Sequence, residues 1–338
     1  MLLRKCLILL MTAALFFSAV TGCSRGASRP AHGRISVVAT AFPQYDFARA
    51  IAGDRADIAL LLKPGMEAHS YEPSPKDIIR ISRCDLLLTV GGESESWLES
   101  VLTSADNPHL RTVAAMDCVD PLEEETAEGM QSREHHHHHD EHDGDETVSP
   151  SGHHDHDGEE EEEEYDEHVW TSPRNAMKIV QSVSDALCEL DPAHADEYRA
   201  NTAAYLAGLE ALDASFRETV AAGRRNVIIF GDRFPLLYFV REYGLDYYAA
   251  FPGCAAETEP SAATVAFLID TVKREKVPVV FYIELSNHKV ADAIAECTGA
   301  RTAQFHTCHN ISYDDFAAGE TYLSLMTDNI AVLREALQ

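Results

Sequence analysis

The sequence has few basic residues for its acidity. Its 338 residues include 27 Lys and Arg against 56 Asp and Glu, which gives a formal net charge of −29 at pH 7. Nucleic-acid binding needs clustered Lys and Arg to neutralise phosphates, so nucleic acid is excluded as a partner. Much of the negative charge falls between residues 123 and 167, so the rest of the chain is only moderately acidic. Acidity of this kind favours cations as ligands.

Long apolar runs are lacking except at the N-terminus. Residues 7–20 form an apolar run after two basic residues, and this run is too short to span a membrane as a mature helix. Small residues directly before Cys23 resemble a bacterial lipobox. We therefore expect a signal peptide at 1–22, lipidation of Cys23, a tether at 23–33, and an extracytoplasmic protein anchored to the cell membrane. An uncleaved anchor and an ordinary secretion signal remain alternatives.

Paired cysteines in a CxxC arrangement are lacking as well, which argues against a structural zinc knuckle. Beyond residue 23 the cysteines are Cys84, Cys118, Cys188, Cys254, Cys297 and Cys308. Export permits disulfides. We predict a disulfide between Cys254 and Cys308, because both follow strands expected in the same half of the chain. Buried thiols remain the alternative.

Short β-rich runs alternate with helical patterns in both halves of the chain. The expected strands are 35–40, 56–62 and 85–90 in the first half, and 226–230, 245–249, 278–283 and 301–305 in the second. This alternation is typical of parallel sheets with crossover helices. The predicted fold is therefore α/β with two lobes, at 34–122 and 224–338, and with residues 168–190 completing the first lobe.

One long helix is expected between the lobes, at 191–223. Its apolar residues recur at helical spacing, which makes a single buried stripe; they are Tyr198, Tyr205, Leu209, Leu212, Phe216 and Val220. About thirty helical residues give a rod of about 45 Å. Glu72-Pro73-Ser74 and Glu259-Pro260-Ser261 each open a helix that leads to a strand, so the two lobes are expected to be of similar construction.

Residues 123–167 form an acidic, histidine-rich loop with almost no apolar residue before Tyr165, so its front part cannot support a core. Its histidines are His135, His136, His137, His138, His139, His142, His153, His154 and His156. We interpret them as a low-affinity metal collector, because ordering flexible ligands costs entropy. A solvated acidic spacer is the alternative.

Candidate metal ligands follow several of the expected strands. Ligands of open parallel sheets bind beyond the carboxyl ends of the strands. His69 follows the second strand of the first half, and His168 lies on the segment that joins the lobes. The candidates after strands of the second half are Asp232, Glu284 and His306, with His309 close to the last. Each alone has an ordinary structural explanation, but together they predict one metal site in a cleft between the lobes.

The chain resembles a known family, the zinc-binding solute-binding lipoproteins of bacterial ABC transporters. The motifs that carry the resemblance are His69 with Glu72-Pro73-Ser74-Pro75, the His-rich loop, Glu167-His168-Val169-Trp170 with Ser172-Pro173, the long helix and the terminal helix 322–337. The resemblance implies two lobes joined by a rigid helix, one metal ion between them, a membrane permease as partner and no catalytic activity. A monomer is expected.

The family's ligands are carried over position by position. Its two histidines of the first lobe fall on His69 and His168. Its third ligand belongs to a His-x-Ala-Phe type segment after the first strand of the second lobe. This sequence lacks that segment, and Asp232 is taken as the third ligand in its place. The fourth falls on His306, with His309 as alternative and Glu284 as a further one if Asp232 is not a ligand.

Three imidazoles and one carboxylate suit Zn²⁺ better than Mn²⁺ or Mg²⁺. Because ligand imidazoles must be deprotonated, metal binding should weaken as the pH falls through about 6.5. A manganese-binding protein or adhesin of the same fold is the main alternative. A secreted zinc hydrolase is the other, although the sequence has neither an HExxH motif nor a nucleophile elbow.

Overall fold

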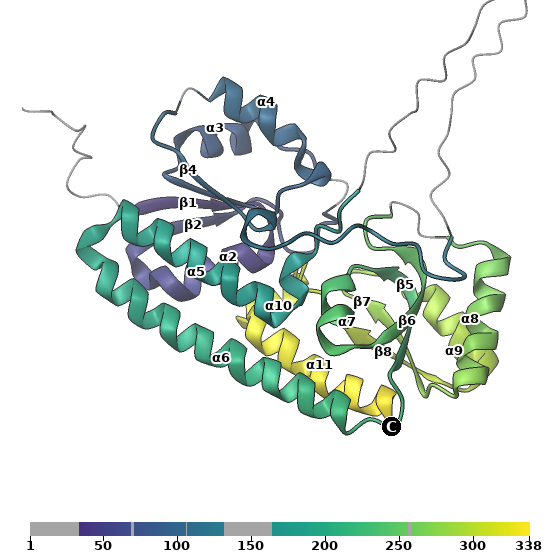
Figure 1. Ribbon diagram of the computed structural model, residues 1–338. Coiled ribbons are helices and arrows are strands. Elements are labelled where there is room, and N and C mark those ends of the chain that lie inside the picture. The colour runs from purple at the N-terminus through teal and green to yellow at the C-terminus, as the bar shows by residue number, and fades with distance from the viewer. Residues whose placement is uncertain (1–33, 69–70, 106, 132–163, 256–258) are drawn as a thin grey trace, which may run out of the picture. The chain divides into compact units, whose positions relative to one another are not determined.

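The computed structural model describes residues 34–68, 71–105, 107–131, 164–255 and 259–338 (Figure 1). The described residues between Ile35 and Gln338 form one compact unit. Several predictions lie outside the described residues: the signal peptide, lipidated Cys23 and its tether, His69, and the nine histidines between residues 135 and 156. No helix of the described part is long and apolar enough to cross a membrane.

The first lobe is built on a parallel four-stranded sheet of order β2-β1-β3-β4. Its strands are β1 (Ile35–Ala39), β2 (Ala56–Leu60), β3 (Leu86–Thr89) and β4 (Arg111–Ala114). Helices α2 (Phe42–Ala52) and α5 (Pro173–Leu190) pack on one face, and α3 (Pro75–Arg83) and α4 (Trp97–Ser104) pack on the other. Both faces are thus covered, as parallel sheets require.

The second lobe repeats this plan with the order β6-β5-β7-β8. Its strands are β5 (Val227–Phe234), β6 (Asp246–Pro252), β7 (Val279–Ile283) and β8 (Arg301–Phe305). Helices α7 (Leu237–Tyr243) and α11 (Tyr322–Leu337) pack on one face, and α8 (Ala262–Glu275) and α9 (Lys289–Thr298) on the other. Ser74 and Ser261 cap α3 and α8 through their side chains, so the repeated motif marks equivalent helix starts.

Short elements complete the described chain. Helix α10 spans Tyr313–Ala318, and single 3₁₀ turns lie at Gly53–Arg55, Glu93–Glu95, Met116–Cys118, Val169–Thr171 and Pro192–His194. The strand β4 and the helix α4 were not predicted, because they are only four and eight residues long.

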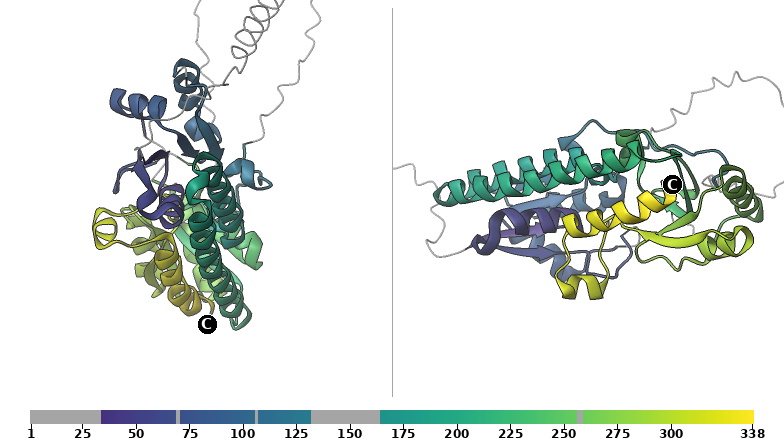
Figure 2. Two further views of the ribbon diagram at one scale, coloured as in Figure 1. Left: turned by 90° about the vertical axis from the view of Figure 1, so that its left-hand side faces the viewer. Right: turned by 90° about the horizontal axis from the view of Figure 1, so that it is seen from below.

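The longest helix, α6 (Ala195–Ala221), contacts both lobes. It packs on α2 and α5 of the first lobe and on α11 of the second, and Figure 2 shows α6 and α11 side by side. Five of the six residues of the predicted apolar stripe are buried, and Val220 packs against the same core. The predicted fold class, two parallel α/β lobes joined by a long helix, is confirmed.

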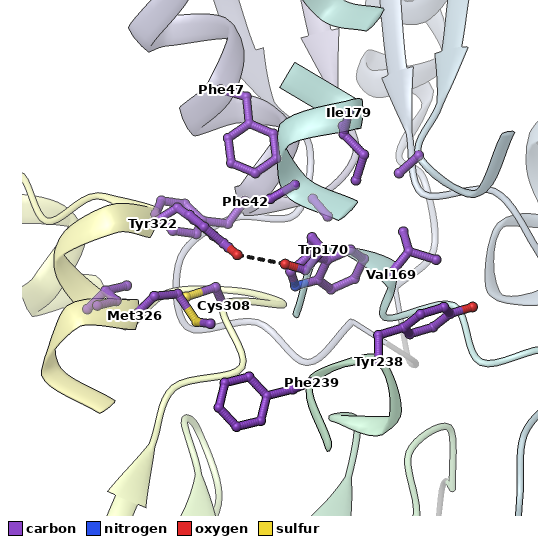
Figure 3. Close-up of a cluster of buried hydrophobic side chains, with 14 of the residues drawn as sticks. Phe42, Phe47, Val169, Trp170, Ile179, Tyr238, Phe239, Cys308, Tyr322 and Met326 are labelled. Carbon is purple, nitrogen blue, oxygen red and sulfur yellow. Dashed lines mark hydrogen bonds between the residues drawn. The ribbon is translucent and has the colours of Figure 1, made fainter. Parts of the chain in front are cut away.

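The lobes also share a core around Trp170, which is completely buried (Figure 3). Trp170 Nε1 donates a hydrogen bond of 2.9 Å to the Thr307 carbonyl in the second lobe. The Tyr322 hydroxyl of α11 donates one of 2.6 Å to the Trp170 carbonyl, drawn as a dashed line in Figure 3. A continuous core across the junction resists large rotation of one lobe against the other, since packed cores are not continuously deformable.

Candidate metal site

A cavity lies where loops of the two lobes meet the joining segment. Among its lining residues are Glu67, Ala68, His168, Arg233, Glu284 and His309. Glu67 and Ala68 follow β2, Arg233 lies near the end of β5, Glu284 follows β7, and His309 follows β8. The loops beyond the carboxyl ends of both sheets therefore supply its walls, as expected for parallel sheets.

His168 is completely buried and is held by Asp166. Asp166 Oδ1 accepts a hydrogen bond of 2.7 Å from the His168 backbone N–H and lies 3.0 Å from Nδ1 of the same histidine. A carboxylate on Nδ1 favours the tautomer with the proton there, which makes Nε2 the nitrogen that can bind a metal. A buried carboxylate of this kind is what commonly orients a metal-binding histidine in proteins.

The segment that carries Asp166 is tied to both lobes. Glu123 and Tyr165 form an isolated antiparallel bridge, and the Asp166 N–H donates to the Leu122 carbonyl at 2.9 Å. The Tyr238 hydroxyl of α7 donates to the Asp166 carbonyl at 2.8 Å and accepts from the Leu122 N–H at 2.9 Å. Burial raises the pKa of Tyr238 to about 12, so this hydroxyl remains a donor at neutral pH.

His309 packs edge-to-face against His168 at the cavity wall. The two imidazole centroids are 4.9 Å apart and the ring planes make an angle of 83°. Glu284 fixes the loop that carries His309: its Oε1 accepts from the Thr307 hydroxyl at 2.6 Å and from the His309 N–H at 3.1 Å, and its Oε2 accepts from the Thr307 N–H at 2.8 Å. Between them Cys308 adopts a left-handed backbone with φ of 60°. Three hydrogen bonds to one buried carboxylate hold this unusual turn.

Hydrogen bonds join the loops of the two lobes beside His168 and His309. Asn310 Nδ2 donates to the carbonyls of Lys63 and Met66 at 2.9 and 2.7 Å, and the Gly65 N–H donates to the Ile311 carbonyl at 2.8 Å. The loop that leads to His69 therefore rests on the loop that carries His309.

An ion pair spans the same junction. Arg233 Nη2 lies 2.8 Å from Glu67 Oε2, and Nη1 lies 3.2 Å from Glu67 Oε1, so the guanidinium binds the carboxylate through both oxygens. Arg233 is buried, and Nη1 also donates to the Ala255 carbonyl at 3.4 Å. Glu67 thus meets a protein cation at the cavity wall.

Two residues of the predicted ligand set, Asp232 and His306, are not among the residues that line the cavity. The register of β5 shifts between Phe230 and Arg233, next to Asp232. The Asp232 carboxylate accepts hydrogen bonds from the backbone N–H groups of Arg233 and Ile283, so it binds the backbone of β5 and β7. The backbone N–H of His306 donates to Asn329 of α11 at 2.8 Å, and its Nδ1 lies 3.3 Å from Gln304. The two alternatives named from the sequence, Glu284 and His309, line the cavity instead.

The predicted disulfide between Cys254 and Cys308 is not formed, and every cysteine among the described residues is a thiol. Cys254 follows β6 and Cys308 follows β8, which are the opposite edge strands of the second sheet. Three strand spacings amount to about 14 Å. That is about twice the Cα separation that a disulfide bridges.

The described residues contain no group of three or more His, Cys, Asp or Glu that could hold a metal ion. What they provide at the cavity is a facing pair of imidazoles, of which one is oriented by a buried carboxylate. Imidazole donors oriented in this way fit Zn²⁺. His69, the third predicted imidazole, lies outside the described residues and directly follows Ala68 of the cavity wall.

Known proteins of similar sequence and fold bear on this site. The zinc-binding lipoprotein AdcA of Streptococcus pneumoniae is 30% identical over 334 residues, which cover 97% of this chain and 60% of AdcA. The high-affinity zinc uptake system protein ZnuA of Bacillus subtilis is 31% identical over 337 residues, 97% of each chain. The chain thus spans 60% of the length of the first of these relatives, which is less than two thirds.

A solved structure, the Zn(II)-bound ZnuA-like domain of Streptococcus pneumoniae AdcA, matches with a TM-score of 0.69 at 26% identity, over 90% of this chain and 99% of that domain. The fold and the cavity define a two-lobed α/β protein of the ZnuA-like type. A family model described as zinc-uptake complex component A, periplasmic, matches residues 37–336. The chain belongs to that family, and the resemblance noted from the sequence is confirmed.

Proposed function

We propose that this protein is an extracytoplasmic receptor that binds Zn²⁺ between its two lobes and delivers it to the membrane permease of an ABC transporter. The observation that carries the proposal is the facing pair His168 and His309 in a cavity walled by both lobes. Zinc-binding and zinc-uptake relatives of 30 and 31% identity support the choice of ligand.

The ligand set that we propose combines His168 and His309 with His69. His309 takes the place given to His306 from the sequence, because His309 lines the cavity. Each imidazole binds the metal as a neutral base, so zinc competes with protons at the site. The proposed set is rich in nitrogen, which favours Zn²⁺ over oxygen-seeking Mn²⁺.

The remaining parts of the receptor are proposed from the sequence and the family. Lipidation of Cys23 anchors the mature chain on the extracytoplasmic side of the membrane. The protein acts as a monomer and releases zinc from the cavity to a permease. We propose no catalytic activity. A zinc hydrolase needs a carboxylate available as general base. The two wall carboxylates, Glu67 and Glu284, are instead held by Arg233 and by the Thr307 loop.

Zinc affinities of histidine variants of the full chain test the proposal. Competition against a chromophoric chelator of high affinity reports the tight site and not the weaker His-rich loop. We expect His168→Ala and His309→Ala each to weaken zinc binding about 100-fold or more, since each removes a metal ligand.

The matched control is His306→Ala, which removes an imidazole three residues from His309 that does not line the cavity. Its zinc affinity should stay within about twofold of the parent chain. Tight zinc binding that survives in both His168→Ala and His309→Ala would refute the proposed site. Loss in His306→Ala alone would return that ligand to the set predicted from the sequence.

A further inference from the structure

We propose that Arg233 sets the metal selectivity of the cavity by keeping the Glu67 carboxylate in an ion pair and away from the bound cation. The inference rests on the proposed function, because it concerns the same site. It assigns a specificity role to a residue that is not a metal ligand.

Two opposite charges lie at the cavity wall. Arg233 and Glu67 both line the cavity that holds the imidazoles, one from each lobe. The guanidinium binds both carboxylate oxygens, at 2.8 and 3.2 Å. A bidentate pair of this kind is the strongest geometry available to an arginine and a carboxylate, and it fixes the direction of both side chains.

The ion pair changes which donor atoms are available to a metal ion. The other wall carboxylate, Glu284, accepts three hydrogen bonds from Thr307 and His309. With Glu67 bound to Arg233, both carboxylates are held by protein donors, and the imidazoles remain as the dominant ligands. Nitrogen ligands suit Zn²⁺, whereas Mn²⁺ needs additional oxygen ligands to reach its preferred coordination.

The charges of Arg233 and Glu67 also affect how strongly the cavity attracts a cation. Arginine stays protonated at any physiological pH, so a guanidinium at the wall repels every incoming cation unless Glu67 compensates it. Glu67 therefore has two effects in the intact pair: it neutralises Arg233, and it is withheld from the metal. Loss of Arg233 should therefore strengthen Mn²⁺ binding, whereas loss of Glu67 should weaken the binding of both metals.

The experiment measures Zn²⁺ and Mn²⁺ affinities of the full chain, with chelator competition for zinc and electron paramagnetic resonance of free Mn²⁺ for manganese. Arg233→Gln releases the carboxylate, so we expect Mn²⁺ affinity to rise about tenfold relative to Zn²⁺. Glu67→Gln leaves the guanidinium uncompensated and should weaken binding of both metals about tenfold. Arg233→Lys keeps the charge but cannot bind both carboxylate oxygens, so its selectivity should fall between those of the parent and of Arg233→Gln.

The double variant Arg233→Gln with Glu67→Gln should lose the gain for manganese, because the released carboxylate is then absent. A parent-like ratio of the two affinities in Arg233→Gln, or a gain that persists in the double variant, would overturn the inference. Arg233 is buried, so replacing it also perturbs packing. Glu67 is partly exposed, so Glu67→Gln tests the ion pair with little effect on packing. A parent chain without tight zinc binding would instead overturn the proposed function.

Discussion

Asp166 offers the sharpest test of how the cavity prepares a histidine for metal. Its Oδ1 serves both the backbone N–H and Nδ1 of His168, at 2.7 and 3.0 Å, and both residues are buried. Asp166→Asn keeps the shape but replaces the carboxylate that orients the imidazole with an amide. Losing such a partner typically costs 10- to 100-fold in metal affinity, or about 1.4 to 2.7 kcal/mol.

Asp166→Ala adds a cost to folding. It leaves the buried N–H groups of His168 without their acceptor, which should lower the free energy of unfolding by about 1–3 kcal/mol in metal-free protein. Asp166→Asn retains an oxygen acceptor and should be destabilised less. The assays are zinc competition with a chelator and urea unfolding of the metal-free chain, so that affinity and stability are separated.

A second aspartate–histidine pair provides the control. His194 Nδ1 lies 2.6 Å from Asp191 Oδ2 at the start of α6, outside the cavity. Asp191→Asn should therefore leave zinc affinity within about twofold of the parent. If Asp166→Asn also keeps the parent zinc affinity while its unfolding is normal, the carboxylate does not prepare His168 and the reasoning is refuted.

Three further predictions concern the core, the pH dependence and the His-rich loop. Trp170→Phe leaves the buried Thr307 carbonyl without its indole donor, so the free energy of unfolding should fall by about 1–3 kcal/mol in urea; an unchanged value would contradict the shared core. Burial raises the pKa of Glu95, and the nearby Glu167 adds to the shift. A carboxyl with a raised folded-state pKa contributes stability that is full below its unfolded pKa of about 4.3 and is lost as the pH rises through the folded value. Glu95→Gln should therefore gain stability relative to the parent from pH 4 to pH 7, measured by urea unfolding, and parallel pH curves would exclude the effect. Replacing the nine histidines between residues 135 and 156 by Asn should remove weak zinc binding in calorimetry but leave tight zinc binding unchanged. Loss of tight zinc binding in this variant would show that the loop is the tight binder.

The sequence by itself determined the architecture of the described chain. Alternating strands and helices predict parallel sheets, because period and length are local properties. The stripe from Tyr198 to Val220 predicts the long helix, and its buried residues are those expected. Ser74 and Ser261 mark helix starts because capping involves only neighbouring residues. His168 is followed directly by the apolar residues Val169 and Trp170, and all three are buried.

Only the tertiary structure decided which side chains face the cavity. The register shift in β5 directs Asp232 to the sheet and places Arg233 at the cavity wall, and a shift of one residue reverses the side-chain direction in a strand. The choice between His306 and His309 depends on Glu284, which lies more than twenty residues earlier and holds the Thr307 loop.

The order of strands in each sheet is likewise invisible in the sequence, and it placed Cys254 and Cys308 at opposite edges. Local sequence gives the elements, because propensity, period and capping act over a few residues. The contacts that aim a ligand, pair a charge or separate two thiols join residues far apart in the chain, and they exist only once the lobes have folded and packed together.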